Sequence, residues 1–207
     1  MYTLYGFTTQ NTLKALYVLE ELAADYEFKY VDLFKGEHKQ ESFLKLNPVG
    51  KVPVLQKGDE GLFESGAICR YVANAAESPL YPAAPWPRAK VDQWLDFFSI
   101  HLGKWLSTLY FENVIKEKAD LGPRNATLCE EAHRFMLREM AILDAHLAEN
   151  ACLAGDSLTI ADLFAFAYIE QVKYLDFSWQ DFPHVKAWFD KLEGRDSIQR
   201  ARKKAAA

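Results

Sequence analysis

The sequence has few cysteines, and none stands in a pattern that would pair it with another. The three, Cys69, Cys129 and Cys152, are widely separated, form no C-x-x-C motif and have no histidine cluster nearby. Such spacing indicates neither a vicinal redox pair nor a zinc site. We therefore expect free thiols that serve as small core or surface side chains, in a protein of the reducing cytoplasm.

An excess of positive charge is also missing. Lys and Arg together number 24 against 29 Asp and Glu, which gives a formal net charge of -5. This balance excludes a general electrostatic footprint for nucleic acid or for an anionic membrane. The basic stretch "RARKK" at 200–204 is predicted to be a frayed, solvated tail.

Long apolar runs are absent as well. No run approaches the roughly 18 residues of a membrane span. The start, "MYTLYGF", has no basic leader followed by a long apolar stretch. We expect neither a membrane nor a nucleic acid as a partner.

What the first eighty residues do have is an alternation of strand-like and helix-like patterns. Aromatic and β-branched runs alternate with segments whose apolar residues recur at helical spacing. The predicted strands cover 2–7, 26–33, 51–56 and 61–63, and the predicted helices cover 11–24, 40–47 and 64–77. The order β-α-β-α-β-β-α predicts an α/β domain with a four-stranded mixed sheet and helices packed on it.

A proline-rich segment separates this region from an all-helical one. The stretch "SPLYPAAPWP" holds four of the chain's eight prolines, a composition typical of a linker between domains. The prediction is a first domain at 1–77, a linker at 78–86 and an all-α domain at 87–207.

Four helices are predicted in the second domain. One apolar stripe continues for about thirty residues from Pro87, which suits a first helical position. A second long helix covers 128–147, and the last lies around 182–193. The helix at 158–169 is apolar on all sides and should be the buried centre, opened by a capping box of Thr159 and Asp162.

Together these features resemble the cytosolic glutathione S-transferase family. The resemblance rests on "NPVGKVPVL", on "LFESGAI" at the start of the third helix, on the proline-rich linker and on the "TIADL" cap, and it covers essentially the whole chain. Within the family, the sequence resembles bacterial members, members of the phi type and members whose first loop reads T-P-N. It implies a thioredoxin-like first domain, glutathione as co-substrate with no metal, and a homodimeric detoxifying enzyme of the cytoplasm.

The resemblance explains why a strand-like run contains Pro53, which cannot donate to a strand ladder. In the family the matching proline follows a cis peptide bond, and the backbone of the residue matching Val52 pairs with the cysteinyl part of glutathione. The alternative reading of Pro53 alone is an edge-strand proline.

Further glutathione contacts are implied at both ends of the tripeptide. The residues matching Glu64 and Ser65 hold the γ-glutamyl end, and those matching His38 and Lys51 reach the glycine end. On the residues alone, Ser65 could be a helix N-cap with Glu64 as a neighbour that favours the helix dipole. His38 could equally be a solvated loop residue.

The loop after the first strand, "LYGFTTQNTLK", matches the family's catalytic position. Alignment on members that read T-P-N places Thr9 and Asn11 near the sulfur, with Thr9 as first choice and Asn11 as second. Threonine is not ionised at working pH, so it would donate a hydrogen bond to the thiolate. The loop has no serine or cysteine, and Gln10 stands where proline is common. The alternative is that Thr8, Thr9 and Asn11 only cap the first helix.

The resemblance also implies a pocket in the helical domain for a small apolar electrophile. The candidate lining residues are Phe98, His101, Trp105, Tyr110 and Phe111. An aromatic stripe at helical spacing normally packs inward, so most of these could instead be core.

Three functions stay open from the sequence. The first is transfer of the glutathione sulfur to an apolar electrophile. The second is glutathione-dependent reduction of disulfides or peroxides, towards which members with the T-P-N loop lean. The third is a non-catalytic interaction module, which the missing serine or cysteine would allow.

Overall fold

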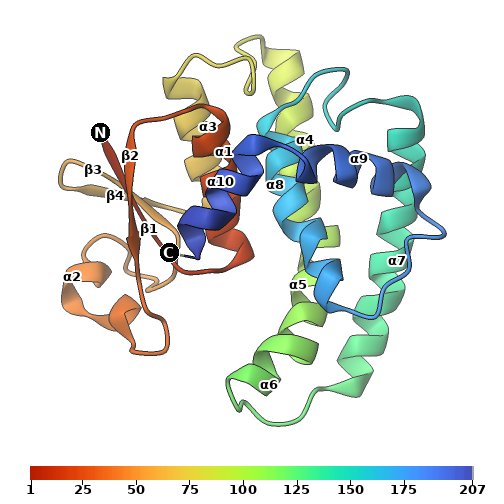
Figure 1. Cartoon of the computed structure of the whole chain (residues 1–207), viewed down its shortest axis with the longest axis horizontal. Coiled ribbons are helices and arrows are strands. Elements are labelled where there is room, and N and C mark those ends of the chain that lie inside the picture. Colours follow the sequence, from red (N-terminus) through yellow and green to blue (C-terminus); the bar gives the residue numbers. More distant parts are fainter. Residues whose placement is uncertain (207) are drawn as a thin grey trace. The chain divides into compact units, whose positions relative to one another are not determined.

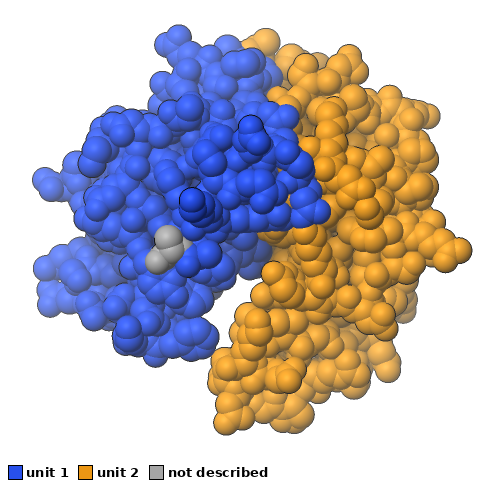
Figure 2. All heavy atoms as spheres, viewed as in Figure 1, with its two compact units in different colours: residues 1–83, 193–207 blue, residues 84–192 orange. Residues whose placement is uncertain are grey.

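The computed structural model describes residues 1–206 of the chain. The described chain forms two compact units, coloured separately in Figure 2. Unit 1 comprises residues 1–83 and 193–207, and unit 2 comprises residues 84–192. The last segment thus groups with the N-terminal unit, whereas the sequence had suggested one helical domain over 87–207. The boundaries 1–77 and 78–86 stay a prediction.

Unit 1 has the predicted element order (Figure 1). Its strands are β1 (Tyr2–Gly6), β2 (Tyr26–Tyr30), β3 (Val54–Lys57) and β4 (Glu60–Phe63). Its helices are α1 (Gln10–Glu21), the 3-10 turn η1 (Glu37–Lys39), α2 (Glu41–Leu44), α3 (Ser65–Ala75) and α10 (Asp196–Ala205). The strands form one mixed sheet in the order β2-β1-β3-β4, which confirms the predicted α/β fold class for this part.

Only one strand pair of the sheet is parallel. β1 runs parallel to β2 and antiparallel to β3, and β3 runs antiparallel to β4. The parallel pair needs a crossover, which α1 provides, while a tight turn suffices for β3 and β4. The apolar residues of α1 pack inward, and Leu16, Val18 and Leu19 are fully buried.

The end of the chain is where the structure departs most from the prediction. Residues 200–204 do not form a frayed tail, because they lie in α10, which packs against α1 (Figure 1). Ile198, Ala201 and Ala205 are buried on its apolar side. The prediction was wrong because Glu20, the acidic partner of Arg200 and Lys204, lies on α1, far away in sequence.

Unit 2 is all-helical, as predicted. Its elements are α4 (Pro85–Ile100), α5 (Leu102–Tyr110), the π-helical turn η2 (Phe111–Ile115), α6 (Lys116–Lys118), α7 (Ala126–Glu149), α8 (Ile160–Ile169), the 3-10 turn η3 (Glu170–Tyr174) and α9 (Pro183–Glu193). The predicted thirty-residue helix is divided at His101, whose φ of -109° and ψ of -102° interrupt the helix. The apolar stripe continues across the break, so the hydrophobic pattern does not indicate that the helix is interrupted at His101.

The predicted capping box of α8 is confirmed. Asp162 accepts hydrogen bonds from the Thr159 amide at 2.9 Å and from the Thr159 hydroxyl at 3.0 Å. Every residue of α8 is buried, as expected for a central helix. Across residues 1–206, no helix is both long and apolar enough to cross a membrane.

Candidate functional site

The strand register of unit 1 brings the predicted site residues to one end of the sheet. Gly6 at the end of β1 lies opposite Tyr30 at the end of β2, because these strands are parallel. Tyr5 lies opposite Val54 at the start of β3, and Val54 lies opposite Phe63 at the end of β4. The segments that leave or enter the strands here carry all the predicted residues: 7–11, 31–38, 51–53 and 64–65.

The segment before β3 presents backbone groups. The Val52–Pro53 peptide bond is cis, as the resemblance implied. Within residues 1–206, no hydrogen-bond partner is found for the backbone N–H or C=O of Val52. A backbone donor and acceptor at this place can pair with an extended peptide as an added strand would.

Asn47 holds this segment in place through two hydrogen bonds, and the sequence did not identify it as a site residue. Its amide nitrogen donates to the carbonyl of Lys51 at 2.7 Å, and its amide oxygen accepts from the Val49 amide at 3.0 Å. Asn47 is 1% exposed, and both of these hydrogen bonds are made to backbone groups of the loop. The signal available in the sequence was its place directly before Pro48, since asparagine there favours a turn.

Gly50 allows the loop before β3 to lie close to η1. Its φ is +62°, and a Cβ at this position would lie 3.1 Å from the carbonyl oxygen of His38. Both features favour glycine. The backbone of His38 thus lies close to Gly50, which directly precedes Lys51, and the contact of both residues with glutathione stays a prediction.

His38 has an unsatisfied polar atom. Its Nδ1 is buried and has no hydrogen-bond partner within residues 1–206. A buried ring nitrogen without a partner is costly and calls for a ligand or water. This favours a binding role over the solvated-loop alternative.

The start of α3 combines an unusual backbone with free helix N–H groups. Glu64 has φ +70° and ψ 111°, a conformation that costs on the order of 1–3 kcal/mol in a non-glycine residue and is common at ligand sites. Glu64 occupies the N-cap position, but its side chain makes no cap hydrogen bond. The alternative in which Ser65 is the N-cap is wrong, because Ser65 is the first helical residue. An anion at this N-terminus would be favoured by the helix dipole.

The loop after β1 gives Thr9 and Asn11 different roles. Thr9 is the N-cap of α1, where its hydroxyl accepts from the Thr12 amide at 3.4 Å and lies 3.2 Å from the Thr12 hydroxyl. Asn11 lies in the first turn, and its side-chain oxygen accepts from the Lys14 ammonium at 2.7 Å. The capping alternative therefore holds for Thr9 but not for Asn11.

Thr8 faces elsewhere. Its hydroxyl donates to the carbonyl oxygen of Ala205 in the last turn of α10 at 2.8 Å. This contact links the candidate catalytic loop to the C-terminal helix. Tyr5 of β1 donates its hydroxyl to Gln56 on the neighbouring strand at 2.9 Å.

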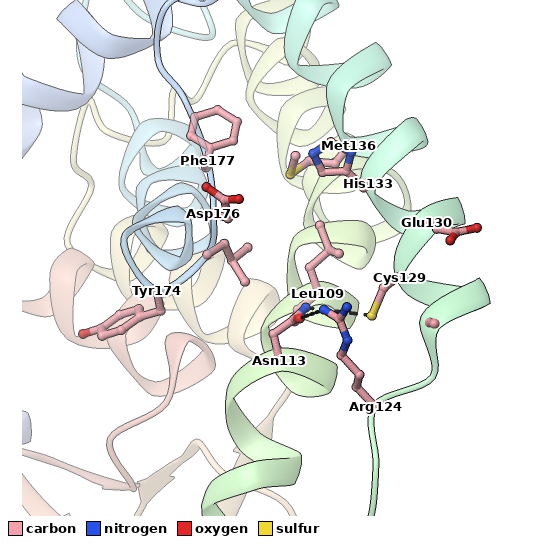
Figure 3. A pocket seen from close by; sticks show the side chains of 12 residues that line it. Leu109, Asn113, Arg124, Cys129, Glu130, His133, Met136, Tyr174, Asp176 and Phe177 are labelled. Atoms are coloured by element: carbon pink, nitrogen blue, oxygen red, sulfur yellow. Dashed lines mark hydrogen bonds between the residues drawn. The ribbon is translucent and has the colours of Figure 1, made fainter.

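Unit 2 contains a cavity of about 340 Å³ (Figure 3). Cys129, His133 and Met136 line it from α7, and Leu109 and Asn113 line it from α5 and the π-helical turn. The side-chain oxygen of Asn113 accepts a hydrogen bond from the Arg124 guanidinium at 2.9 Å. The remaining lining residues are Ala126, Glu130, Tyr174, Leu175, Asp176 and Phe177.

The five aromatic and histidine candidates for the electrophile pocket do not line this cavity. Phe98 is fully buried and matches the core alternative, whereas Trp105 is half-buried and stacks on Phe135 with ring centres 4.8 Å apart. Tyr110 packs edge-on against Tyr174, a cavity residue. Phe111 is 43% exposed, and His101 occupies the break between α4 and α5. The place of the electrophile pocket stays a prediction.

Within residues 1–206, no group of three or more His, Cys, Asp or Glu side chains is placed to hold a metal ion. The thiol of Cys69 is buried, and burial raises its pKa to about 12, so it is protonated at neutral pH. The site residues brought together at the sheet end are thus donors, acceptors and free backbone groups. Such a set can bind a peptide and stabilise an anion.

Two family models match the chain. The model described as "Glutathione S-transferase, N-terminal domain" covers residues 1–74, and the one described as "Glutathione S-transferase, C-terminal domain" covers residues 100–196. Similarity to known proteins extends over nearly the whole length. Glutathione S-transferase 3 of Zea mays is 36% identical over 205 residues, which cover 95% of this chain and 91% of the relative.

The chain is also similar to solved structures and to one part of a second type of protein. The structure of a glutathione S-transferase-I bound with lactoylglutathione superposes with a TM-score of 0.89 at 31% identity, covering 99% of this chain and 98% of the other. Elongation factor 1-gamma 2 of Oryza sativa subsp. japonica is 34% identical over 197 residues, but these cover only 44% of that longer protein. The similarity thus includes free-standing transferases and one part of a larger protein.

Proposed function

The chain belongs to the glutathione S-transferase family, and from this premise we propose that it binds glutathione in unit 1 and activates the thiol for attack on a small apolar electrophile. The thiolate sulfur displaces a leaving group from the electrophile or adds to it, and the thiol proton passes to solvent. As is typical of the family, we expect the chain to work as a homodimer.

The observation that carries the proposal is the set of unused polar groups at one end of the sheet. Glutathione is an extended tripeptide with a carboxylate at each end. The backbone of Val52 suits its cysteinyl amide, as the edge of a sheet suits an added strand. The N-terminus of α3 with Ser65 suits the γ-glutamyl carboxylate, and Glu64 suits the neighbouring ammonium group. His38 and Lys51 suit the glycine carboxylate.

The energy needed for thiol activation is within reach of this site. A thiol of pKa near 8.5 is only a few per cent ionised at neutral pH, and lowering its pKa by two units takes about 2.7 kcal/mol. A hydrogen bond to a charged group contributes roughly 1.5–3 kcal/mol, and a helix N-terminus contributes about 0.3–1 kcal/mol. One donor at the start of α1, from Thr9 or Asn11, is therefore enough.

The proposal is tested by titrating glutathione into the wild-type chain and into Ser65→Ala. We expect the dissociation constant to rise at least about tenfold in Ser65→Ala, since a hydrogen bond to a carboxylate is lost. Ser42→Ala is the matched control, because Ser42 is an exposed serine of α2 at some distance from the α3 N-terminus in sequence. Wild-type protein that fails to bind millimolar glutathione would overturn the proposal.

A second candidate, a non-catalytic binding module, is favoured by the similarity to elongation factor 1-gamma 2. It predicts that glutathione, if it binds, keeps an unperturbed thiol and that no conjugate forms with an activated aryl halide. Conjugate formation with a bound thiolate supports the transferase. Turnover of peroxide or disulfide with two glutathione molecules consumed, and without conjugation, would instead support the reductase.

A further inference from the structure

A buried lysine lies directly beneath the candidate catalytic loop. Lys14 lies on α1 one turn after Asn11, and only 1% of its surface is exposed. Lysine is almost never fully buried unless it has a specific partner. The ammonium nitrogen lies 2.7 Å from the side-chain oxygen of Asn11. The transferase chemistry proposed above does not by itself account for this lysine.

The contact fixes which way the Asn11 amide faces. In the structure the Lys14 side-chain nitrogen donates to the Asn11 side-chain oxygen, and the ammonium form of lysine has no lone pair with which to accept from an amide N–H. The amide nitrogen, with its two N–H donors, is then left on the other side of the same planar group. An unsupported asparagine can rotate its amide and present either end. Asn11 next to Lys14 presents its donor end away from the lysine.

The groups around Lys14 besides Asn11 come from α3, which packs on α1. Burial lowers the pKa of Lys14 well below its usual value, whereas the negative charge of Glu64, at the start of α3, raises the pKa and so favours the ammonium form that donates to Asn11. The thiol of Cys69 on α3 donates to the backbone carbonyl of Lys14 at 3.5 Å. Glu64 is itself a predicted glutathione contact. The lysine is thus linked to both sides of the candidate site.

Thr9 is less suited than Asn11 to a dedicated donor role. Its hydroxyl already accepts from the Thr12 amide and lies 3.2 Å from the Thr12 hydroxyl oxygen, which is a competing acceptor for its single proton. The Asn11 amide has two protons, and its oxygen is already satisfied. The geometry therefore distinguishes two residues that the sequence could only rank.

We propose that Lys14 is a positioning residue that orients the Asn11 amide, so that Asn11 rather than Thr9 donates the main hydrogen bond to the glutathione sulfur. This rests on the proposed transferase function. In the reaction, Asn11 donates to the thiolate without losing a proton. Lys14 touches Asn11 and not the substrate.

The test measures the thiol pKa of bound glutathione by its ultraviolet thiolate absorbance, for wild type, Asn11→Ala, Lys14→Met and the double variant. Methionine keeps most of the volume of lysine and removes the donor. We expect each single variant to raise the thiol pKa by about one unit, which is about a tenfold loss of thiolate near neutral pH. The double variant should be no worse than Asn11→Ala alone, because the two residues act as one unit.

The dissociation constant of S-methylglutathione serves as a second readout. It has no thiol to ionise, so we expect its binding to change less than about threefold in Lys14→Met. An unchanged thiol pKa in Lys14→Met would overturn the proposal. So would a Lys14→Met effect that persists in full in the Asn11→Ala background, since Lys14 would then act through its charge alone.

Asn11→Asp keeps the proposal testable if Lys14→Met does not fold. Aspartate retains the contact with the Lys14 ammonium but has no N–H donor, so the fold is kept and the thiol pKa should rise as in Asn11→Ala. A thiol pKa that is unchanged in Asn11→Asp would contradict the inference. Failure of the proposed function itself differs from all these results, because wild-type protein would then not lower the thiol pKa at all.

Discussion

The two ends of α1 differ in what their polar residues do. At the C-terminal end, the Glu20 carboxylate accepts from Tyr26 at 2.7 Å, from Arg200 at 2.9 Å and from Lys204 at 2.8 Å. At the N-terminal end, Asn11 has one hydrogen bond to Lys14 and a donor group left over. The same helix thus has one end saturated by its own chain and one end with capacity for a ligand.

The neighbouring Glu21 repeats the pattern of the C-terminal end. Its carboxylate accepts from the guanidinium of Arg195, with Nε at 3.1 Å, and from the Ser197 hydroxyl at 2.5 Å. These partners come from α10 and the residue before it. Helix α1 therefore separates two tasks along its length: α10 packs against one end and stabilises the fold, and the other end carries the proposed catalytic site.

The largest effect should follow from removing α10. A chain that stops after Gly194 loses the burial of Ile198, Ala201 and Ala205 against α1, together with the ion pairs to Glu20 and Glu21. Burial of one isoleucine contributes about 1.5–3 kcal/mol, and an uncompensated buried carboxylate costs more. We expect the free energy of unfolding, measured by urea denaturation, to fall by more than about 3 kcal/mol.

The matched control for this truncation stops after Ala205, which leaves α10 whole. It should unfold at the same urea concentration as the full chain, because only two residues beyond the helix are removed. If the two truncations were equally stable, α10 would not be the stabilising partner of α1.

A smaller effect is expected from neutralising the two glutamates. Burial opposes ionisation of Glu20, but hydrogen bonds from Lys204, Tyr26 and Arg200 outweigh it and lower its pKa. In the same way, hydrogen bonds from Arg195 and Ser197 outweigh burial at Glu21 and lower its pKa. A carboxylate with a lowered folded-state pKa stabilises the fold above its unfolded pKa, and that stability is lost as pH falls through the folded value.

Glu20→Gln/Glu21→Gln should therefore destabilise the chain by about 1–3 kcal/mol at pH 7. Below about pH 4, where the wild type also loses these charges, the difference between the two should shrink. Urea melts across this pH range measure both. The control is Glu41→Gln, whose partner Lys45 is exposed, and which should change stability by less than about 0.5 kcal/mol. If the double variant lost the same amount of stability at every pH, the charges of Glu20 and Glu21 would not be what stabilises the fold.

Thr9→Ala should have a modest effect of a different kind. It removes an N-cap and lowers stability by about 1 kcal/mol. The thiol pKa of bound glutathione should move less than in Asn11→Ala, since Asn11 is inferred to be the main donor. Thermal melts and thiolate titrations on the same two variants separate the effects. A larger pKa change in Thr9→Ala would restore Thr9 as first choice.

The smallest effect should come from Thr8, which joins the two ends of unit 1. Thr8→Val removes the hydrogen bond to Ala205 and should cost about 0.5–1.5 kcal/mol in urea denaturation. The thiol pKa should not change, because the Thr8 hydroxyl is occupied by α10. A shift in the thiol pKa would show that α10 also influences the catalytic loop.

The sequence predicts the parts of the site that depend on local backbone chemistry. Pro53 in a strand-like run and "ESGAI" at a helix start both have local signatures, and the structure places both at the same end of the sheet. The α8 capping box was found for the same reason, since its two residues are three apart in the chain. Such patterns can be predicted from the sequence because the residues that determine each of them lie close together in the chain.

The parts that the sequence could not predict depend on distant contacts. From the local sequence, Arg200 is expected to be solvated. In the fold it donates to Glu20 of α1, which lies 180 residues earlier in the chain. The burial of Lys14 depends on the packing of α1 against α3, which the local sequence does not indicate. The choice between Thr9 and Asn11 depends on that burial, so a loop alignment alone could only rank them.

The most direct measurement is the thiol pKa of glutathione bound to the wild-type chain, followed by its ultraviolet thiolate absorbance across pH. The site at the N-terminal end of α1 predicts a bound thiol that ionises at least one unit below the free value of about 8.5. Glutathione that binds with an unshifted thiol pKa would contradict it, since this end of the helix would then bind the peptide without activating its sulfur.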